Sequence, residues 1–354
     1  MTARSLLVSG LLAAAAAAAA AGAPRPNIWF VMADDLDADW KQDHAAIMPA
    51  LTKHLKKGGI YFENHVAAVP VCGPSRSSLL LSKYPHNNGY KMNGDISSVA
   101  SYCGPHGHQN DTVGNWLARA GYYTTLLGKI VNNCENPPEA GWSHWGGLQN
   151  TYDFYNASIH DVDFDEETGT TPTRVGAIKV MTGVHQAQFL ADFTLEQATI
   201  AVQKKKPFFI HTTPVMPHWG TCIGPQPPKP GYAPDDPHWE ITPGGDPTTG
   251  SLVDPRTGSS MVIPISPCPS HKNAHVFDGQ KNQHIASWNT TASGALPEFM
   301  ASQQLDTFQE AREDLGFRNR SAAVVDLDDL IGAVFDGFEK LGVLENTFVF
   351  FSCV

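Results

Sequence analysis

The sequence has few charged residues, no excess of positive charge, and no long apolar run beyond its first 26 residues. Only 17% of its 354 residues are charged while 42% are hydrophobic, which excludes a disordered chain and indicates a packed globular protein. The formal net charge of -11 argues against a nucleic acid partner, because binding phosphates requires clustered Lys and Arg. No segment after the N-terminal one approaches the ~20 apolar residues of a membrane span.

The N-terminal segment, residues 1–23, predicts a secretory signal peptide. Arg4 precedes an apolar stretch of Leu and Ala that ends in the small residues 21–23, which is the layout of such signals. An Ala-rich helix and an organelle transit peptide are the alternatives. We therefore expect a soluble mature protein in the secretory pathway, located outside the cell, in the periplasm or cell wall, or in the lysosome.

Export would expose the chain to glycosylation and to disulfide formation. Four N-x-S/T sequons, which are candidate glycosylation sites, begin at Asn110, Asn156, Asn289 and Asn319. Two disulfides could form among Cys103, Cys134, Cys222 and Cys268. Spacing alone leaves all three pairings of these cysteines open.

Apolar runs of strand length alternate with segments of helical character. Strands are expected at 27–33, 122–128, 208–213 and 347–351. Helices are expected at about 50–57, 74–82, 184–203 and 324–341. Residues 214–270 are crowded with Pro and Gly and predict a loop inserted over a functional site. This alternation, without an internal repeat, predicts an α/β fold with a mostly parallel central sheet flanked by helices.

Polar residues follow three of the expected strands. Asp34 and Asp35 come directly after the first strand, Lys129 follows the second, and 214–218 follow the third. Ligands of parallel sheets gather beyond the carboxyl ends of the strands, so one site could collect these residues. Paired carboxylates suit Ca²⁺ or Mg²⁺, although Asp35 could instead cap a turn.

The segment 72–76, Cys-Gly-Pro-Ser-Arg, opens an expected helix. Unpaired backbone N–H groups at the start of a helix, together with the guanidinium of Arg76, make an anion site. Cys72 would then be a nucleophile at its edge. A buried cysteine or a disulfide arm is the ordinary alternative.

The same five residues contain C-x-P-S-R, the core motif of the sulfatase family, in which the cysteine is oxidised to formylglycine. Pro, Ser and Arg at these offsets from a given cysteine are on the order of a one-in-ten-thousand coincidence. Four further segments resemble family landmarks in the family's order: 26–35, 127–133, 211–220 and 317–351. Residues 83–87 and 128–132 most resemble N-acetylglucosamine-6-sulfatases and extracellular heparan sulfate endosulfatases, and plant and algal arylsulfatases share these features.

The resemblance implies the alkaline-phosphatase-like sulfatase fold and hydrolysis of sulfate monoesters, with a sulfated small molecule or glycan as the substrate. It implies Ca²⁺ and the conversion of Cys72 to formylglycine (3-oxoalanine) by the formylglycine-generating enzyme. The hydrate of the aldehyde would attack sulfur, and the second hydroxyl would expel sulfate. Asp34, Asp35 and modified Cys72 would hold the metal.

Substrate contacts are also implied by the resemblance. Arg76 would orient the hydrate and neutralise charge, and Lys129 and His218 would contact sulfate oxygens, with His218 protonating the leaving alcohol. Asn132 would add a substrate contact. Considered alone, Lys129 is typical of a solvated surface lysine and His218 of a loop histidine.

The sequence departs from the family pattern at three places. After 347–351 the family continues with Ser-Asp-Asn-Gly, which gives an Asp and an Asn to the metal, whereas residues 352–354 are Ser-Cys-Val. Residues 24–354 are therefore expected to be an incomplete, C-terminally truncated N-terminal catalytic domain. Leu81 and Ser82 replace a Thr-Gly pair of the modification motif, which is expected to slow cysteine oxidation, and Val131 replaces a histidine.

Other functions are open at this point. The chain could be a catalytically impaired isoform, or a secreted protein that binds sulfated glycans through Arg76 and Lys129 without hydrolysing them. A phosphate or phosphonate monoester hydrolase is a further alternative, which the Pro-Ser-Arg context disfavours.

Overall fold

A computed structural model describes residues 25–37, 44–138, 141–164, 172–174, 178–220, 251–253, 260–262, 267–282, 288–289, 304–305 and 307–354. Its strands are β1 (Asn27–Ala33), β2 (Tyr123–Gly128), β3 (His144–Leu148), β4 (Ser158–Phe164), β5 (Pro172–Arg174), β6 (Ile178–Val180), β7 (Phe208–Thr213), β8 (Ser251–Val253), β9 (Ser260–Val262) and β10 (Thr347–Cys353). Its α-helices are α2 (His44–Ile47), α3 (Pro49–Leu51), α4 (Cys72–Leu81), α5 (Pro85–Asn88), α6 (Ile96–Cys103), α7 (Val113–Arg119), α8 (Gln186–Gln203) and α10 (Thr307–Lys340).

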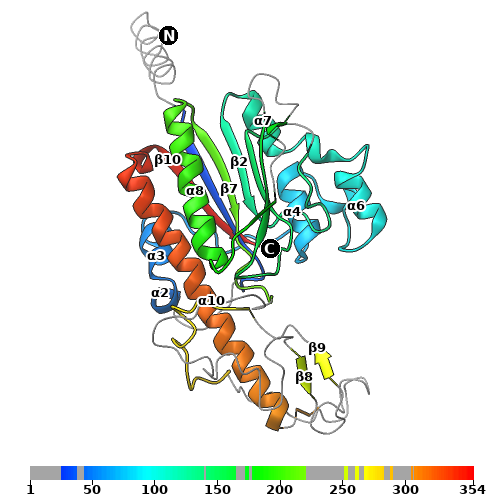
Figure 1. Cartoon of the computed structure of the whole chain (residues 1–354), viewed down its shortest axis with the longest axis vertical. Coiled ribbons are helices and arrows are strands. Elements are labelled where there is room, and N and C mark those ends of the chain that lie inside the picture. The colour runs from blue at the N-terminus through cyan, green and yellow to red at the C-terminus, as the bar shows by residue number, and fades with distance from the viewer. Residues whose placement is uncertain are drawn as a thin grey trace, which may run out of the picture.

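One eight-stranded sheet forms the centre of the molecule (Figure 1). Its order is β10-β1-β7-β2-β3-β4-β5, and β6 pairs with β4. The five strands from β10 to β3 run parallel, whereas β4 is antiparallel to β3 and pairs antiparallel with β5 and β6. The predicted α/β fold with a mostly parallel sheet is confirmed.

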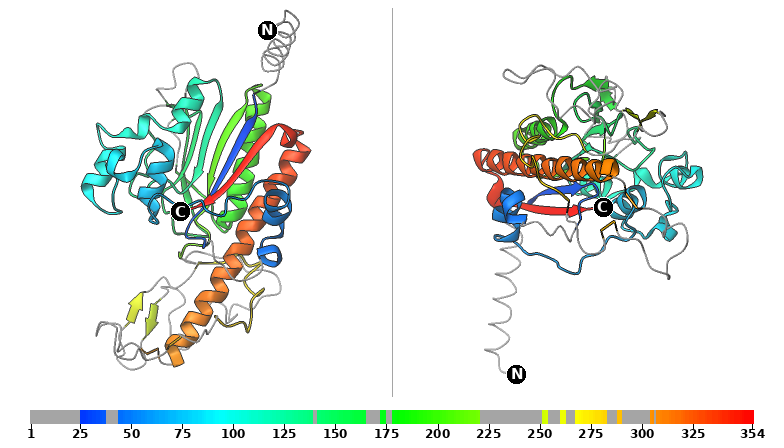
Figure 2. Two further views of the ribbon diagram at one scale, coloured as in Figure 1. Left: turned by 180° about the vertical axis from the view of Figure 1, so that it is seen from behind. Right: turned by 90° about the horizontal axis from the view of Figure 1, so that it is seen from below.

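Helices cover both faces of this sheet. Figure 2 shows α8 and α10 side by side over one face, where the alternate residues Trp29 and Val31 of β1 point into the larger hydrophobic core. The indole of Trp29 is fully buried, with its ring centroid 5.6 Å from that of Phe335 and 5.4 Å from that of Phe338 on α10. On the opposite face Leu80 of α4 belongs to a second core together with β2, β3 and β7. Both sheet faces thus bury apolar side chains, which explains why β1 reads as a continuous apolar run.

The predicted strands are found within two residues of their expected ends, and two predicted helices need correction. The helix expected at 50–57 is short α3 followed by a π-helical turn over Thr52–Lys56. The last helix begins at 307 rather than 324, and Figure 1 shows its N-terminal part extending past the sheet. A helical segment that covers no sheet needs no apolar stripe, so periodicity detects only the second half of α10.

The sequence pattern did not reveal β3 because Gly146 and Gly147 interrupt its apolar residues. A Cβ at Gly146 would lie 2.7 Å from Leu127 Cδ2, and one at Gly147 would lie 2.4 Å from Ile130 Cδ1. The glycines therefore allow β3 to pack closely against the end of β2. Within the predicted loop 214–270, β8 and β9 form a hairpin, so this segment has regular structure.

One disulfide joins Cys103 to Cys134, which resolves one pairing that the spacing left open. Cys268 is also disulfide-bonded, and Cys222 lies outside the described residues. The predicted signal peptide, residues 1–23, lies outside them too. No described helix combines the length and the apolar character needed to cross a membrane.

The sequon asparagines differ in exposure. Asn110 is exposed, whereas the other three, Asn156, Asn289 and Asn319, are partly buried. The side-chain amide of Asn289 donates to Leu305 O and to Glu310 Oε1, at 2.8 Å in both cases. Glycosylation at these four positions stays a prediction.

Candidate active site

Three parallel strands end at the same edge of the sheet and bring distant residues together. Asp34 follows β1 and donates its backbone N–H to Met216 O (3.2 Å), in the segment that follows β7. Lys129 follows β2 and donates its N–H to Thr213 O (2.8 Å). Because β7 lies between β1 and β2, the residues after all three strands converge, as predicted from their positions after the strands.

Helix α4 points its N-terminus toward this edge and begins at Cys72, two residues earlier than expected. Gly73 is required there, because a Cβ would lie 2.3 Å from Asn93 Oδ1 and 2.4 Å from the ring of Tyr90. Cys72 is a free thiol and only 8% exposed, which excludes the disulfide alternative. Burial first, and then the charge of Asp34, raise the pKa of this thiol, so it is protonated near neutral pH.

Asp34 is fully buried between two cations. Lys129 Nζ lies 2.5 Å from Asp34 Oδ2, and Arg76 Nη2 lies 3.3 Å from Asp34 Oδ1. Burial, the largest influence, acts to raise the pKa of Asp34, but the charges of Arg76 and Lys129 outweigh it and hold the pKa below its usual value. Burial likewise acts to lower the pKa of Lys129, and Asp34 more than compensates, so that this pKa is raised. All three groups are therefore charged at neutral pH.

Arg76 retains donors suited to an anion. Its Nη1 donates to Lys129 O (3.0 Å), but its Nε and Nη2 make no hydrogen bond within the described part of the chain, although the residue is only 2% exposed. Buried guanidinium donors without acceptors are costly. An oxyanion at this position would satisfy them.

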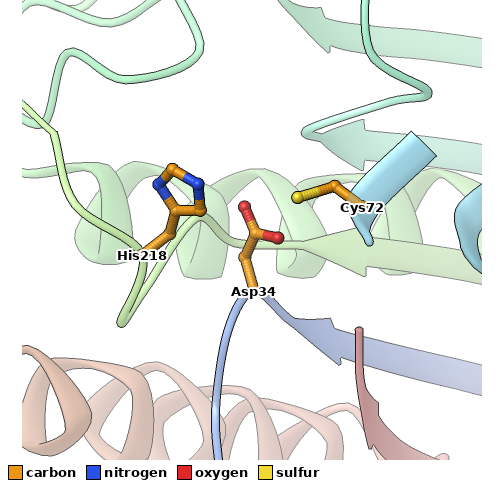
Figure 3. A group of neighbouring side chains, drawn as sticks. All are labelled: Asp34, Cys72 and His218. Atoms are coloured by element: carbon orange, nitrogen blue, oxygen red, sulfur yellow. The ribbon is translucent and has the colours of Figure 1, made fainter. Parts of the chain in front are cut away.

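A cation could share the same carboxylate. Ligand atoms of Asp34, Cys72 and His218 all lie within 4.8 Å of one another, with Asp34 between the other two (Figure 3). Asp35 lies alongside, its Oδ2 3.5 Å from His218 Nε2. Asp34 Oδ1 accepts no hydrogen bond among the described residues. The structure thus brings two of the three predicted metal ligands, Asp34 and Cys72, within reach of one cation, and it places Asp35 next to His218.

The chemistry of these donors decides which cation fits. A thiolate and an imidazole suit a soft or borderline metal, whereas Ca²⁺ binds oxygen. With the encoded thiol at position 72, Asp34 and Asp35 supply the oxygen donors among these four residues. An oxygen in place of the Cys72 sulfur, as in formylglycine, would add a third oxygen donor of the kind that Ca²⁺ binds.

His218 follows a cis Met216–Pro217 peptide and is held by its own neighbour. Its Nδ1 donates to Trp219 O (2.7 Å), so the hydrogen on Nδ1 is engaged and Nε2, on the side of Asp35, can exchange a proton. The ring is only 7% exposed. His218 therefore lies in the site and not in a solvated loop.

Tyr152, which sequence analysis did not identify, contacts most of the predicted substrate residues. Its hydroxyl accepts from Lys129 Nζ (3.3 Å) and from Asn132 Nδ2 (3.4 Å). Its ring stacks on His218 at 4.8 Å and on Trp219 at 4.9 Å, and those two rings lie 5.0 Å apart. Three nearly equal distances mean that His218 and Trp219 lie over the same face of Tyr152. A tyrosine in an unpredicted turn after β3 carries no sequence signal for this role.

Arg320 of α10 was also missed, because the helix was expected to begin after it. Its guanidinium donates to the backbone oxygens of Asp35 and, at 3.5 Å, of Pro217, and it pairs with Asp37 Oδ2 at 3.3 Å. Two of the segments that carry site residues are thus linked through one side chain.

Comparison with known proteins identifies a family. The sulfatase family model matches residues 26–352. An arylsulfatase of Volvox carteri is 28% identical over 351 residues, covering 93% of this chain and 46% of the relative. An N-acetylglucosamine-6-sulfatase of Capra hircus is 24% identical over 346 residues, covering 94% and 50%. The chain thus spans about half the length of these curated relatives.

Solved structures share the fold. The Bacteroides fragilis protein YidJ superposes with a TM-score of 0.59 at 16% identity, covering 93% of this chain and 62% of that one. A protein solved with its substrate D-glucosamine-2-N,6-O-disulfate gives 0.56 at 20% identity, covering 93% and 65%. The predicted fold is confirmed.

Proposed function

Because the chain belongs to the sulfatase family, we propose that it hydrolyses sulfate monoesters of the arylsulfatase or glucosamine-6-sulfatase type, using Ca²⁺ and formylglycine at position 72. The observation that carries this proposal is the buried carboxylate of Asp34. It lies between the cations Arg76 and Lys129, and its ligand atom lies within 4.8 Å of those of Cys72 and His218. An anion site and a cation site thus share one residue. Sulfate ester hydrolysis needs both, since the oxygens must be neutralised while a nucleophile is held near sulfur.

Arg76 and Lys129 bind and orient the sulfate group. The guanidinium of Arg76 and the ammonium of Lys129 converge on Asp34 from helix α4 and from the end of β2. Being buried, they act in a medium of low dielectric constant, where their attraction for an anion exceeds that of surface cations. Asn132 supports Tyr152 and, through it, Lys129.

Position 72 holds the nucleophile at the start of α4. When formed there, the aldehyde hydrate of formylglycine would supply an oxygen nucleophile, and Ca²⁺ held by Asp34, Asp35 and that oxygen would lower the cost of ionising it. The helix N-terminus and Arg76 stabilise negative charge at this position. Because Nδ1 of His218 donates to Trp219 O, its Nε2 is the nitrogen that would transfer a proton to the leaving alcohol.

A secreted location and glycosylation belong to the same proposal. Two named relatives are extracellular sulfatase homologues from Drosophila melanogaster and Caenorhabditis elegans. Together with the signal-like segment 1–23 they support export, and residues 24–354 form the proposed catalytic domain. Export also places the chain where cysteine oxidation to formylglycine would take place.

The test combines the state of residue 72 with turnover. The chain is expressed in a secreting host and the peptide containing residue 72 is analysed by mass spectrometry, while p-nitrophenyl sulfate and N-acetylglucosamine 6-sulfate are assayed with Ca²⁺ and with chelator. Formylglycine and Ca²⁺-dependent turnover that Cys72→Ala abolishes are expected. An unmodified thiol without turnover would refute the proposal. Binding of sulfated glycan by both forms without hydrolysis would favour a binding protein instead.

A further inference from the structure

A pocket of about 110 Å³ lies directly beside the site. It is lined by residues 129–133, by Glu135, and by Thr151 and Tyr152. Lys129 and Tyr152 belong both to this pocket and to the site, so the two are continuous. Since a ~150 Å³ cavity accepts a whole benzene ring, this pocket takes most of one six-membered ring.

The wall of this pocket is held in place by covalent and hydrogen bonds. The Cys103–Cys134 disulfide ties the segment to helix α6. Cys134 N donates to Val131 O (3.0 Å), and the hydroxyl of Tyr90 donates to Asn132 O (2.6 Å). A wall fixed in this way is organised before any ligand arrives, which lowers the entropic cost of binding.

Opposite charges mark the lining of the pocket. Lys129 contributes an ammonium that is paired with Asp34, whereas Glu135 has no Lys, Arg or His within ion-pair distance among the described residues. Within the described part of the chain, Glu135 Oε1 accepts the backbone N–H of Asn133 (3.0 Å) and no other donor. Burial, followed by the negative charge of Glu135, raises the pKa of Tyr90 to about 12, so this charge is felt at the wall. The negative charge of Glu135 therefore has no cationic partner among the described residues.

We propose that this pocket receives the ring of the alcohol half of the substrate and that Glu135 makes it selective against a second anionic substituent. The inference rests on the proposed function and specifies its substrate. The sulfate lies against Lys129, and the ring extends into the pocket toward Glu135. A neutral or amino-substituted ring is preferred there, because a second sulfate would meet an unpaired carboxylate at short range. Asn132 Oδ1, which has no hydrogen-bond partner among the described residues, accepts from a ring hydroxyl or amide.

Three sugars that differ in one substituent test this selectivity. Glucosamine 6-sulfate, N-acetylglucosamine 6-sulfate and glucosamine 2-N,6-O-disulfate carry a cationic, a neutral and an anionic group on the same ring. For the unmodified sequence we expect kcat/KM to fall in that order. Glu135→Gln should raise kcat/KM for the disulfate by about tenfold, the effect of one charge at close range in a partly screened site, and leave the neutral sugar within about twofold.

Matched controls separate this charge from general electrostatics. Glu196→Gln on the exposed face of α8 removes the same charge away from the site and should leave all three ratios unchanged. In the unmodified chain, raising the salt concentration should reduce the ratio of kcat/KM for the neutral sugar to kcat/KM for the disulfate, because salt screens the carboxylate. The same ratio in Glu135→Gln should not change. Equal ratios in Glu135→Gln and the unmodified chain would overturn the inference.

Binding measurements distinguish failure of this inference from failure of the proposed function. If no sugar is hydrolysed, the three sulfates are stable ligands whose dissociation constants can be measured by calorimetry. The same order of affinity for the three sugars, with the differences removed by Glu135→Gln, would support ring binding in this pocket even without hydrolysis. Three equal affinities, or no binding, would reject it.

Filling the pocket supplies an independent variant. Thr151→Trp should lower the affinity for the ring sulfates by about tenfold or more through lost burial of one ring, while inorganic sulfate binds as before. Thr151→Ser is the matched control. Equal losses for ring sulfates and inorganic sulfate, in a variant whose thermal unfolding is unchanged, would contradict a ring-binding role.

Discussion

Two regions of the molecule bury aspartates in opposite ways. At the ends of β1 and β2, Asp34 lies between cations and has an oxygen that accepts no hydrogen bond among the described residues. On α10, Asp328 accepts the backbone N–H groups of Ala50 and Leu51, at 2.8 Å each. We call this second region the α10 anchor, formed by Asp326 and Asp328 with their partners.

The anchor satisfies its acids with neutral donors. Asp326 accepts from the backbone N–H and hydroxyl of Ser270 and from the amide of Asn273 (2.8 Å). These bonds hold segments to the helix and leave these acids little capacity for a ligand. Around the active site, Asp34 Oδ1, Arg76 Nε and Nη2, and both ring nitrogens of the nearby His211 make no hydrogen bond among the described residues. The acids of the anchor thus hold segments of the fold together, whereas Asp34 keeps an oxygen that a ligand could use.

The largest effect is expected from Lys129→Met. It leaves Asp34 buried with one fewer cation, which should lower the free energy of unfolding by about 3–5 kcal/mol and kcat/KM by about 10²–10³-fold. Denaturant titration and sulfate ester kinetics measure the two. The control is Lys272→Met, which breaks an exposed 2.8 Å pair with Asp329 and should cost less than about 1 kcal/mol. Similar costs for the two would remove the distinction between the regions.

A pH-dependent effect is expected from His211. Burial, and then the charge of Arg76, lower its pKa from 6.5 to about 3. Between pH 6.5 and about pH 3 the unfolded chain binds a proton at this histidine and the folded chain does not. As the pH falls through this window, the histidine therefore lowers the free energy of unfolding by about 1.4 kcal/mol per pH unit. His211→Leu should therefore reduce the slope of the free energy of unfolding against pH, measured between pH 7.5 and 4.5.

The His106→Leu variant is the control for His211, because it removes a histidine from an exposed position rather than from the core. An unchanged slope in His211→Leu would mean that the buried imidazole is protonated in the folded protein.

At the anchor, Asp328→Ala should lower the free energy of unfolding by about 1–3 kcal/mol, because the N–H groups of Ala50 and Leu51 lose their acceptor. Initial rates of sulfate ester hydrolysis should be unchanged under conditions where the variant is folded. Asp329→Ala, at a more exposed position on the same helix, is the matched control. A large loss of activity in folded Asp328→Ala would show that the anchor also organises the site.

The smallest effect is expected from Tyr152→Phe. The lost hydroxyl accepts two long hydrogen bonds, of 3.3 and 3.4 Å, so kcat/KM should fall by only about two- to tenfold. Tyr152→Leu should cost more, because the ring that stacks on His218 is lost as well. Tyr84→Phe, at an exposed position, is the control. Equal kinetics for the Phe and Leu variants would argue against a role for the ring.

The elements that sequence analysis predicted well are those buried on both faces. Residues 28–33 are continuously apolar and 208–213 begin with three apolar residues, and each segment forms a strand of the parallel core. Strand β4 was missed because its apolar residues alternate with polar ones and form no continuous apolar run. It lies beyond the parallel core and pairs antiparallel with β3. Half of α10 was missed where it extends past the sheet.

The site residues were likewise found where the segment that carries them was predicted, and missed where it was not. Asp34, Lys129 and His218 were predicted from their places after predicted strands together with the resemblance to the sulfatase family, and the structure brings them together. Tyr152 and Arg320 were missed because the first follows an unpredicted strand and the second lies in the unpredicted half of a helix. Their contacts depend on neighbours from other parts of the chain, which no local spacing records.

The sequence by itself determined which segments are buried, where strands end in polar residues, and that a helix begins near Pro74 with Cys72 just before it. These are local properties, since periodicity, composition and turn residues act over a few positions. Only the tertiary structure decided that Asp34 is shared by two cations and by Cys72 and His218, that Cys103 pairs with Cys134, and that a pocket containing Glu135 adjoins them. The reason is the sheet order, which places β7 between β1 and β2 and so brings together residues far apart in the chain.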